Sequence, residues 1–585
     1  MKRGFKRGMV LVMAASMLMQ ACTGGATSQA SSQSAAKVSD LNLVDPDGKA
    51  TTIHGFTKEG LPVPYVDLVE YMHTVYDPKN VFSLSSQGSG AYKISNAKGE
   101  MTVDTAKDTI HSDKIEQFLY NDERLDPTNT NYYVYEHIIA TEYRESPKAL
   151  DIDFSKYGID IIEEGGRVYF PLTTAADLTG VTYINTVYSD NKIYQNYSIN
   201  KPDVKWQANY NKETRDPGEI AYTYGELCFM MDYVYGDAPH CALAKSISEK
   251  GLDATLESYS DETRLVKELL KSDKMVDYIF GISILSAMLY DGGHTDLFTD
   301  IMTDLEGVAA FDEYSRIVHE EKEDKRAALF TKYYSDNVHK MDAKFQIKEL
   351  NGEYDKYKAV FDDQQDVDVR YSYFEYNNTG IYVFTTFNDD AVKYFKKALD
   401  LAKEHGMKNF ILDDSNNGGG STESCMYILN AITKDKRDEF YYAGTMTGNT
   451  VYEKLDYDMD QDGKFEGDAE DFDYNFNYAV MCSQGSYSSG NILPCLSKEA
   501  GIPIIGETSA GGTCNLVYFK MDLGVQYSLS AFRTFNYKKG GDLEAGATPD
   551  YDILKKNPDG TKDYSDFRNF KLLDEIVNKH YATNQ

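Results

Sequence analysis

Between residues 380 and 420 the chain alternates two apolar segments with one amphipathic segment, and this order restricts the fold more than any other feature. The segments GIYVFTTF (380–387) and NFILDDSNNGGG (409–420) are typical of buried strands, and the second runs into glycines. Between them lies a helical pattern with an Asp N-cap at its start and Gly406 at its end. Strand, helix, strand and glycine turn in this order predict a βαβ unit in a parallel sheet.

The chain has 585 residues, which is too long for one such unit, and its composition changes along its length. Residues 41–205 are rich in Tyr, Val, Thr, Asn and Gly in short alternating stretches, which predicts a β-rich accessory domain. Residues 206–300 have helical spacing, with an uncharged apolar run that predicts a buried helix. Residues 301–370 form a charged, mixed connecting segment, and 371–585 form the predicted α/β core.

The N-terminus has the pattern of an export signal. In residues 1–21, four basic residues precede an uncharged apolar stretch that is too short to span a bilayer. Ala21-Cys22 resembles the bacterial lipobox, which implies cleavage before Cys22 and its lipidation; a plain signal peptide is the alternative. Residues 22–40 are small and polar, as in a flexible tether. We therefore expect an exported lipoprotein of the bacterial cell envelope, anchored to a membrane by acyl chains.

The charge balance excludes one class of partner. The chain has 93 acidic and 60 basic residues, a net charge of −33, and removal of the signal peptide makes it four units more negative. A nucleic-acid partner requires Lys and Arg to neutralise phosphates, so we expect no nucleic-acid binding. The six cysteines after Cys22 have neither the density of a disulfide scaffold nor the spacing of a zinc site.

Three segments carry residues that suit acyl transfer. In residues 411–424 a glycine turn leaves backbone N–H groups open toward a ligand. In residues 485–513 a serine-rich turn precedes a helix, whose dipole and spare N–H groups stabilise an alkoxide or oxyanion. DGGHTDLF (291–298) places a histidine at the end of the apolar helix.

Together, these segments resemble the tail-specific, or C-terminal processing, serine peptidase family. DDSNNGGG is similar to its Asp-x-Arg-x-Asn-x-Gly-Gly turn, SYSSGN to its Ser-x-Ser-x-x-Glu nucleophile segment, and IIGETSAGG to its Ile-Gly-x-x-(Thr/Ser)-x-Gly stretch. The resemblance extends over about residues 213–575. It implies a crotonase/ClpP-like α/β core with parallel βαβ units, and a serine peptidase that acts on a peptide or protein substrate.

The resemblance also implies roles for individual residues. The nucleophile falls on Ser488, with Ser486 and Ser489 as the alternatives. The oxyanion donors are the backbone N–H groups of Gly419 and Ser489. No cofactor is expected for catalysis.

The general base departs from the bacterial processing enzymes, which use a Lys in a Gly-Lys-Gly segment. Here that place falls on Gly512 or its neighbour Gly511, so no lysine is available. The tricorn-like branch uses Ser, His, a second Ser and Glu; His294 resembles its His, and Glu544 in DLEAGATPD resembles its Glu. The resemblance therefore implies His294 as base and Glu544 as the acid that orients it.

Two positions depart from that branch as well. Gly293 stands where the auxiliary Ser precedes the His, so the Glu-to-His connection is predicted to be direct, through Thr295, or through water. Asn491 replaces the family's Glu near the nucleophile. Together with the missing Lys, these departures favour the alternative hypothesis, a non-catalytic peptide- or ligand-binding lipoprotein that kept the peptidase fold. Among active enzymes, both endopeptidase and C-terminal processing activity remain open, whereas an esterase is disfavoured because no Gly-x-Ser-x-Gly elbow is present.

An Asp-rich insertion at 456–471 resembles a calcium loop. Alternate carboxylates followed by Gly463 reproduce the first half of such a loop, in which carboxylates converge on one hard cation. The closing position is Ala469, with acidic residues on both sides. The sequence predicts a structural Ca²⁺ beside the cleft, with a solvated acidic loop as the alternative. The predicted ligands are Asp458, Asp460, Asp462, Lys464 and Asp468.

Overall fold

A computed structural model describes residues 38–583 with short gaps. The gaps are 46–47, 77, 120–134, 180–184, 197–208, 237–240, 242, 299–304, 306, 322, 350–353, 355, 367–368, 434–437, 466–471, 473, 522 and 525. The predicted signal peptide, Cys22 and most of the tether lie outside the described residues. Within the described residues, no helix combines the length and apolar character that a membrane span needs.

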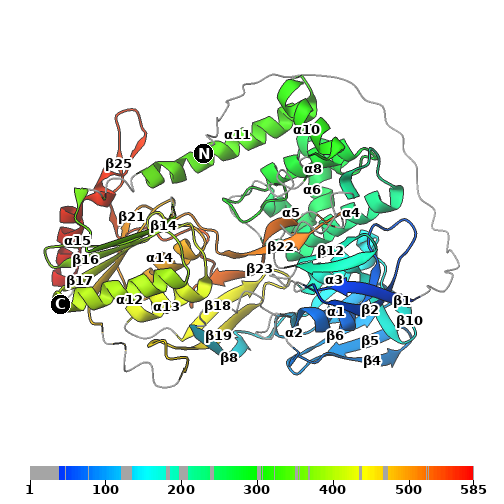
Figure 1. The fold of residues 1–585 in the computed structure, drawn as a ribbon, viewed down its shortest axis with the longest axis horizontal. Helices are drawn as coiled ribbons and strands as arrows, with labels where there is room; N and C mark the ends of the chain where they lie inside the picture. The colour runs from blue at the N-terminus through cyan, green and yellow to red at the C-terminus, as the bar shows by residue number, and fades with distance from the viewer. Residues whose placement is uncertain are drawn as a thin grey trace.

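The predicted βαβ unit is confirmed as part of a seven-stranded sheet (Figure 1). In spatial order the strands are β14 (Phe361–Asp366), β15 (Val369–Tyr376), β16 (Thr379–Phe384), β17 (Asn409–Asp413), β20 (Asn477–Cys482), β21 (Ile504–Gly506) and β24 (Tyr551–Asp552). The pairings from β16 to β24 are parallel, and those from β14 to β16 are antiparallel. The carboxyl ends of β17 and β20 therefore lie side by side, where the glycine turn and the serine-rich turn begin.

Helices cover both faces of this sheet. One face packs against α12 (Asp389–Glu404), α13 (Thr422–Ile432) and α14 (Ser489–Glu499), and the other against α15 (Phe570–Thr583). The N-cap of α12 is Asn388, whose side chain accepts from Ala391 N–H at 2.9 Å, rather than the expected Asp. The predicted α/β core is thus confirmed.

A second sheet of five strands lies beside the first. Its strands are β22 (Cys514–Lys520), β23 (Gln526–Asn536), β18 (Glu439–Gly444), β19 (Thr450–Tyr457) and β8 (Glu136–Tyr143). The edge strand β8 belongs to the N-terminal half of the chain and pairs antiparallel with β19 (Figure 1). One sheet therefore joins the N-terminal half to the C-terminal half.

The N-terminal half is β-rich, as predicted, with two sheets of its own. The first contains β10 (Ile162–Glu164), β11 (Arg167–Pro171), β3 (Tyr65–Asp67), β2 (Ala50–Phe56), β1 (Ser39–Val44), β13 (Lys192–Asn196) and β12 (Asn185–Ser189). The second contains β4 (Ser83–Gly88), β5 (Ala91–Ser95), β6 (Glu100–Asp104), β7 (Thr109–Ser112) and β9 (Leu150–Asp153). The helices packed with them are α1 (Leu68–Val75), α2 (Ile115–Leu119) and α3 (Leu172–Thr179).

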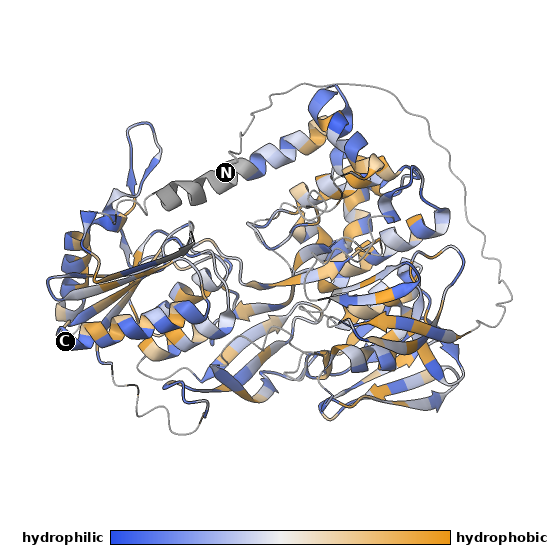
Figure 2. Ribbon diagram, in the orientation of Figure 1, coloured by the Kyte–Doolittle hydropathy of each residue, from blue (hydrophilic) through white to orange (hydrophobic). Residues whose placement is uncertain are grey.

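A helical region follows, centred on α8 (Met275–Met288), which is buried over most of its length. Its other helices are α4 (Pro217–Phe229), α5 (Ala244–Lys250), α6 (Leu252–Ser258), α7 (Asp261–Leu270), α10 (Ala309–Glu320) and α11 (Lys325–Glu349). Figure 2 shows long apolar stretches along this part of the ribbon. The hairpin β22–β23 contributes Val517, Leu529 and Phe532 to the same apolar core, so this core extends to the α/β domain.

A buried carboxyl group joins the accessory domain to the helical region. Glu226 on α4 accepts hydrogen bonds from Thr173 Oγ1 (2.7 Å) and Thr174 Oγ1 (2.8 Å) of α3, and from Tyr222 OH (2.8 Å). Burial raises the pKa of Glu226 to about 7, although these hydrogen bonds oppose the rise.

Candidate active site

Ser488 lies in a sharp turn between β20 and α14. Its backbone has φ 59° and ψ −126°, a conformation that costs a residue other than glycine about 1–3 kcal/mol. Its N–H donates to the Gly511 carbonyl at 2.9 Å, which holds the turn. The residue is half-buried, and no described residue forms a hydrogen bond with its Oγ. The strained turn therefore presents the Ser488 hydroxyl without a competing acceptor.

The two alternative nucleophiles are hydrogen-bonded within the fold. Ser486 Oγ donates to the Asp414 carbonyl at 2.7 Å and accepts from Ser483 N–H at 3.0 Å, and the residue is fully buried. Ser489 Oγ donates to the Gly420 carbonyl at 2.9 Å. Of the three serines, Ser488 has the hydroxyl best suited to attack.

A cavity of about 660 Å³ opens beside Ser488. His294, the glycine turn after β17 and the start of β22 also line it, together with aromatic residues that include Tyr518 and Phe535. None of its described lining residues is Lys, Arg, Asp or Glu. The cavity therefore combines a serine and a histidine with otherwise uncharged walls.

His294 follows α8 on the loop 291–295. Its ring is buried, and its Nδ1 lies 2.9 Å from the Cys514 carbonyl. A carbonyl only accepts, so Nδ1 carries a proton, and Nε2 is the nitrogen that takes up or releases a second one. In the structure, no hydrogen bond joins the described side chains of His294 and Ser488, although both line the cavity.

Asp291 organises the histidine loop, and our sequence analysis did not identify it. Its Oδ1 accepts the N–H groups of Gly293 (3.1 Å), His294 (2.9 Å) and Thr295 (3.0 Å). Its Oδ2 accepts the hydroxyls of Thr295 (2.6 Å) and Ser530 (2.7 Å). Burial alone would raise the pKa of Asp291, but the charge of His294 and these hydrogen bonds outweigh it and hold the pKa below its ordinary value. An anion thus lies beside His294. The signal available in the sequence was the turn-forming spacing Asp-Gly-Gly-His.

Glu544 reaches His294 through the backbone and not by a hydrogen bond to the ring. Its carboxylate accepts the N–H groups of Gly512 (2.7 Å), Thr513 (2.7 Å) and Cys514 (3.1 Å), and the Thr513 hydroxyl (2.8 Å). Cys514 in turn offers its carbonyl to His294. Of the routes considered from the sequence, Thr295 does not provide the link, because its hydroxyl bonds to Asp291.

The predicted oxyanion donors differ in their environments. The N–H of Gly419 donates to Asn417 Oδ1 at 2.9 Å, so in this structure it is engaged within its own turn. Its neighbours Gly418 and Gly420 line the cavity, as does Ser489 at the start of α14. Among the described residues, no acceptor pairs with the N–H of Gly418, Gly420 or Ser489.

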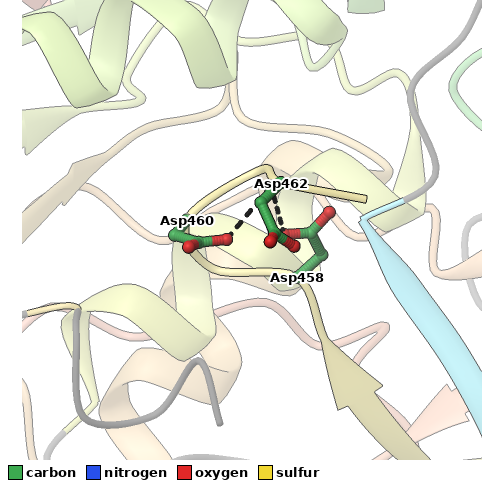
Figure 3. Close-up of side chains that lie close together, drawn as sticks. All are labelled: Asp458, Asp460 and Asp462. Atoms are coloured by element: carbon green, nitrogen blue, oxygen red, sulfur yellow. Dashed lines mark hydrogen bonds between the residues drawn. The ribbon is translucent and has the colours of Figure 1, made fainter. Parts of the chain in front are cut away.

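The Asp-rich loop brings three of the five predicted metal ligands together (Figure 3). Asp458 is buried, Asp460 and Asp462 are exposed, and one carboxylate oxygen from each lies within 4.8 Å of the others. The Lys464 ammonium bonds to Asp462. Asp468 lies outside the described residues.

Comparisons with known proteins give one family match and several similar solved structures. Residues 378–553 match the model of peptidase family S41. No curated protein sequence matches the chain significantly. Similar solved structures include a photosystem II D1 C-terminal processing protease, at 18% identity over 31% of this chain and 45% of that one, with a TM-score of 0.24. The chain thus spans about half the length of that structure.

Two further solved structures have similarly low sequence identities and TM-scores. A putative peptidase from Parabacteroides merdae is 15% identical over 42% of this chain and 82% of that one, with a TM-score of 0.28. A putative S41 protease from Bacteroides fragilis is 14% identical over 32% and 52%, with a TM-score of 0.25. The family model covers the strands that carry the glycine turn and the serine turn, so residues 378–553 of this chain are similar to peptidase family S41, in agreement with the family resemblance seen in the sequence.

Proposed function

We propose that this chain is an active, exported serine peptidase in which Ser488 attacks a peptide carbonyl. The observation that carries the proposal is the position of Ser488: a strained residue at the start of α14, with its hydroxyl on a cavity that His294 also lines. Strained backbone at a strand-to-helix turn is a recurrent way to expose a nucleophile.

His294 supplies the base in this proposal. With Nδ1–H donated to the Cys514 carbonyl, Nε2 accepts the Ser488 proton and later gives it to the leaving amine. Catalytic hydrogen bonds are often long in the unliganded state, and they tighten when substrate closes the site. Asp291 stabilises the imidazolium that forms, and Glu544 holds the segment 512–514 in place to receive Nδ1–H.

The oxyanion that develops on the substrate carbonyl needs N–H donors. Ser489 N–H lies at the N-terminus of α14, where unpaired N–H groups and the helix dipole favour negative charge. We propose Gly418 or Gly420 as the second donor, because both line the cavity and Gly419 is engaged by Asn417.

Covalent labelling with a fluorophosphonate tests the nucleophile. The mature native protein and Ser486→Ala are expected to be labelled, and Ser488→Ala is expected to remain unlabelled. Hydrolysis of a peptide library by the native protein, with the cleavage position read by mass spectrometry, would distinguish an endopeptidase from a C-terminal processing peptidase. Labelling of Ser488→Ala, or none of the native protein, would overturn the proposal.

The second candidate function is non-catalytic peptide binding. It is favoured by the engaged Gly419 N–H and by the missing hydrogen bond between His294 and Ser488. This candidate predicts that library peptides bind the native protein and Ser488→Ala equally well, and that neither protein cleaves them.

We also propose that the chain is exported and lipid-anchored through Cys22, on the basis of its N-terminal pattern. Incorporation of a labelled fatty acid into the native protein, and its loss in Cys22→Ala, tests the anchor. Cell fractionation tests export separately, because a plain signal peptide would release the native protein in unlipidated form.

Finally, we propose a structural Ca²⁺ held by Asp458, Asp460 and Asp462, because their carboxylates converge in one loop (Figure 3). Ca²⁺ is expected to raise the melting temperature of the native protein, and Asp458→Asn is expected to remove most of that rise. Asp190→Asn, in a turn of the accessory domain, is the matched control. A melting temperature that is the same in Ca²⁺ and in chelator would refute this proposal.

A further inference from the structure

Tyr487, the residue before the nucleophile, contacts each of the segments that build the site. Its N–H donates to the Asn417 carbonyl of the glycine turn at 3.0 Å. Its ring meets the ring of His294 edge-on, with 4.9 Å between centroids and 65° between planes. Its hydroxyl donates to the Asp291 carbonyl at 3.4 Å. The residue is only 4% exposed, so its ring fills the space between the serine turn and the histidine loop.

Glycines on two other loops leave room for this ring. A Cβ on Gly292, two residues before His294, would lie 3.0 Å from Tyr487 Cε2. A Cβ on Gly512, in the segment held by Glu544, would lie 2.3 Å from Tyr487 Cε2 and Cζ. A contact under 3.0 Å requires something to shift, and the ring is enclosed by the rest of the site. The His294 loop and the segment that binds His294 Nδ1 thus both pack on one aromatic ring.

We propose that Tyr487 is a positioning residue that fixes the His294 imidazole relative to Ser488. This inference rests on the proposed function, because it assigns Tyr487 a part in the same proton transfer. Proton transfer requires about 2.6–3.2 Å between the heavy atoms, and a misplacement of about 1 Å costs about 100-fold in rate. Tyr487 directly precedes Ser488, so the ring couples the position of the base to the turn that carries the nucleophile. The same ring excludes water from one side of the imidazole.

Two substitutions separate the ring from its hydroxyl. Tyr487→Phe keeps the ring and loses the neutral hydrogen bonds of the hydroxyl, which include the long one to the Asp291 carbonyl, so kcat is expected to stay within about threefold of the native value. Tyr487→Ala removes the ring, so kcat is expected to fall about 10- to 100-fold while KM changes less than about threefold. The acidic limb of kcat/KM is expected to move to higher pH, because water reaches and stabilises the imidazolium.

Tyr564→Ala is the matched control for loss of a buried tyrosine. Tyr564 is also 4% exposed and lies in the core on the α15 side of the sheet, outside the cavity lining. Tyr564→Ala and Tyr487→Ala are both expected to lower the melting temperature. Below that temperature, Tyr564→Ala is expected to leave the pH profile of kcat/KM unchanged. A purely structural role for Tyr487 would give the two variants the same profile.

Gly512→Ala provides a second, independent test. The added methyl group is expected to displace the Tyr487 ring and reduce kcat, with part of the loss due to the left-handed backbone at φ 78°. In the double variant Tyr487→Ala/Gly512→Ala the clash is absent, so the two losses are expected to combine to less than their product.

The outcomes distinguish this inference from the proposed function. A native protein that neither cleaves peptides nor reacts with fluorophosphonate refutes both. If the native protein is active and Tyr487→Ala keeps the native kcat and pH profile, only the role of Tyr487 is refuted. The same holds if the native protein is active and the kcat losses of Tyr487→Ala and Gly512→Ala multiply fully in the double variant.

Discussion

Replacement of Asp291 by Asn removes one negative charge from the histidine loop and keeps the shape of the side chain. The amide oxygen can still accept the three backbone N–H groups that Oδ1 accepts, and the amide nitrogen faces two hydroxyls that can rotate to accept from it. The substitution therefore isolates the charge of Asp291 from its hydrogen-bonding role.

The expected magnitude follows from the charge interaction. Unit charges about 6 Å apart at an effective dielectric constant of about 20 interact by about 3 kcal/mol, or about two pKa units. Loss of Asp291 disfavours protonated His294, so the acidic limb of kcat/KM is expected to move about one to two pH units lower. The imidazolium also forms during the reaction, so kcat is expected to fall about 10- to 100-fold.

The assay is peptide hydrolysis from pH 4 to pH 9, with fluorophosphonate labelling at pH 7. Asp296→Asn is the control, because it makes the same substitution on the other side of His294, where the side chain accepts from Ser286 and the Phe298 N–H. An Asp291→Asn profile that superimposes on the native one would show that Asp291 does not stabilise the imidazolium.

Asp291 also affects stability in a direction that can be checked. Its pKa is lowered in the folded state, so the stability it contributes is present above the ordinary aspartate pKa and is lost as pH falls through the lowered value. Asp291→Asn should therefore lose less stability than the native protein when pH is reduced below 4.

Three further predictions concern buried polar groups. Ser486→Ala should keep its fluorophosphonate labelling but lose about 1–3 kcal/mol of unfolding free energy, because the buried Ser483 N–H loses its acceptor and the Asp414 carbonyl keeps only its bond from the Asn417 N–H; loss of labelling would contradict this. Glu544→Gln should lower kcat/KM about tenfold or more in peptide hydrolysis, since an amide cannot accept from all the donors around it; unchanged hydrolysis would exclude its orienting role. The raised pKa of Glu226 means that native stability present below pH 4.5 declines as pH rises toward about 7; urea unfolding at pH 5 and pH 7 should show this loss in the native protein and not in Glu226→Gln.

The sequence was sufficient for the α/β core because its signals are local. The strands β16 and β17 are continuous apolar runs, and α12 between them has an apolar face of helical period, so each element could be identified without its neighbours. The glycines after β17 and the serines after β20 then had to meet, because parallel strands bring their carboxyl ends to one edge.

The parts that could not be predicted depend on contacts between distant segments. The sequence near Asp291 shows a turn, but its bond to Ser530 brings together residues 239 positions apart. Gly419 was expected to donate to the substrate, whereas the side chain two residues earlier, Asn417, takes its N–H in the folded turn. Glu544 was placed near His294 by resemblance, yet its carboxylate bonds to the backbone of Gly512 and its neighbours.

The pairing of β8 with β19 has a consequence for how the chain folds. Lys454 on β19 bonds to Glu142 on β8 across 312 residues, and closing a loop of that length costs about 5 kcal/mol of chain entropy. During synthesis, β8 emerges long before β19, so β8 stays without its partner strand until β19 has been made. Contacts of such high sequence separation slow folding, and an unpaired strand edge can form a β-sheet with another chain, which leads to aggregation. Correct assembly of this sheet therefore requires that β8 remains unpaired until β19 has been synthesised.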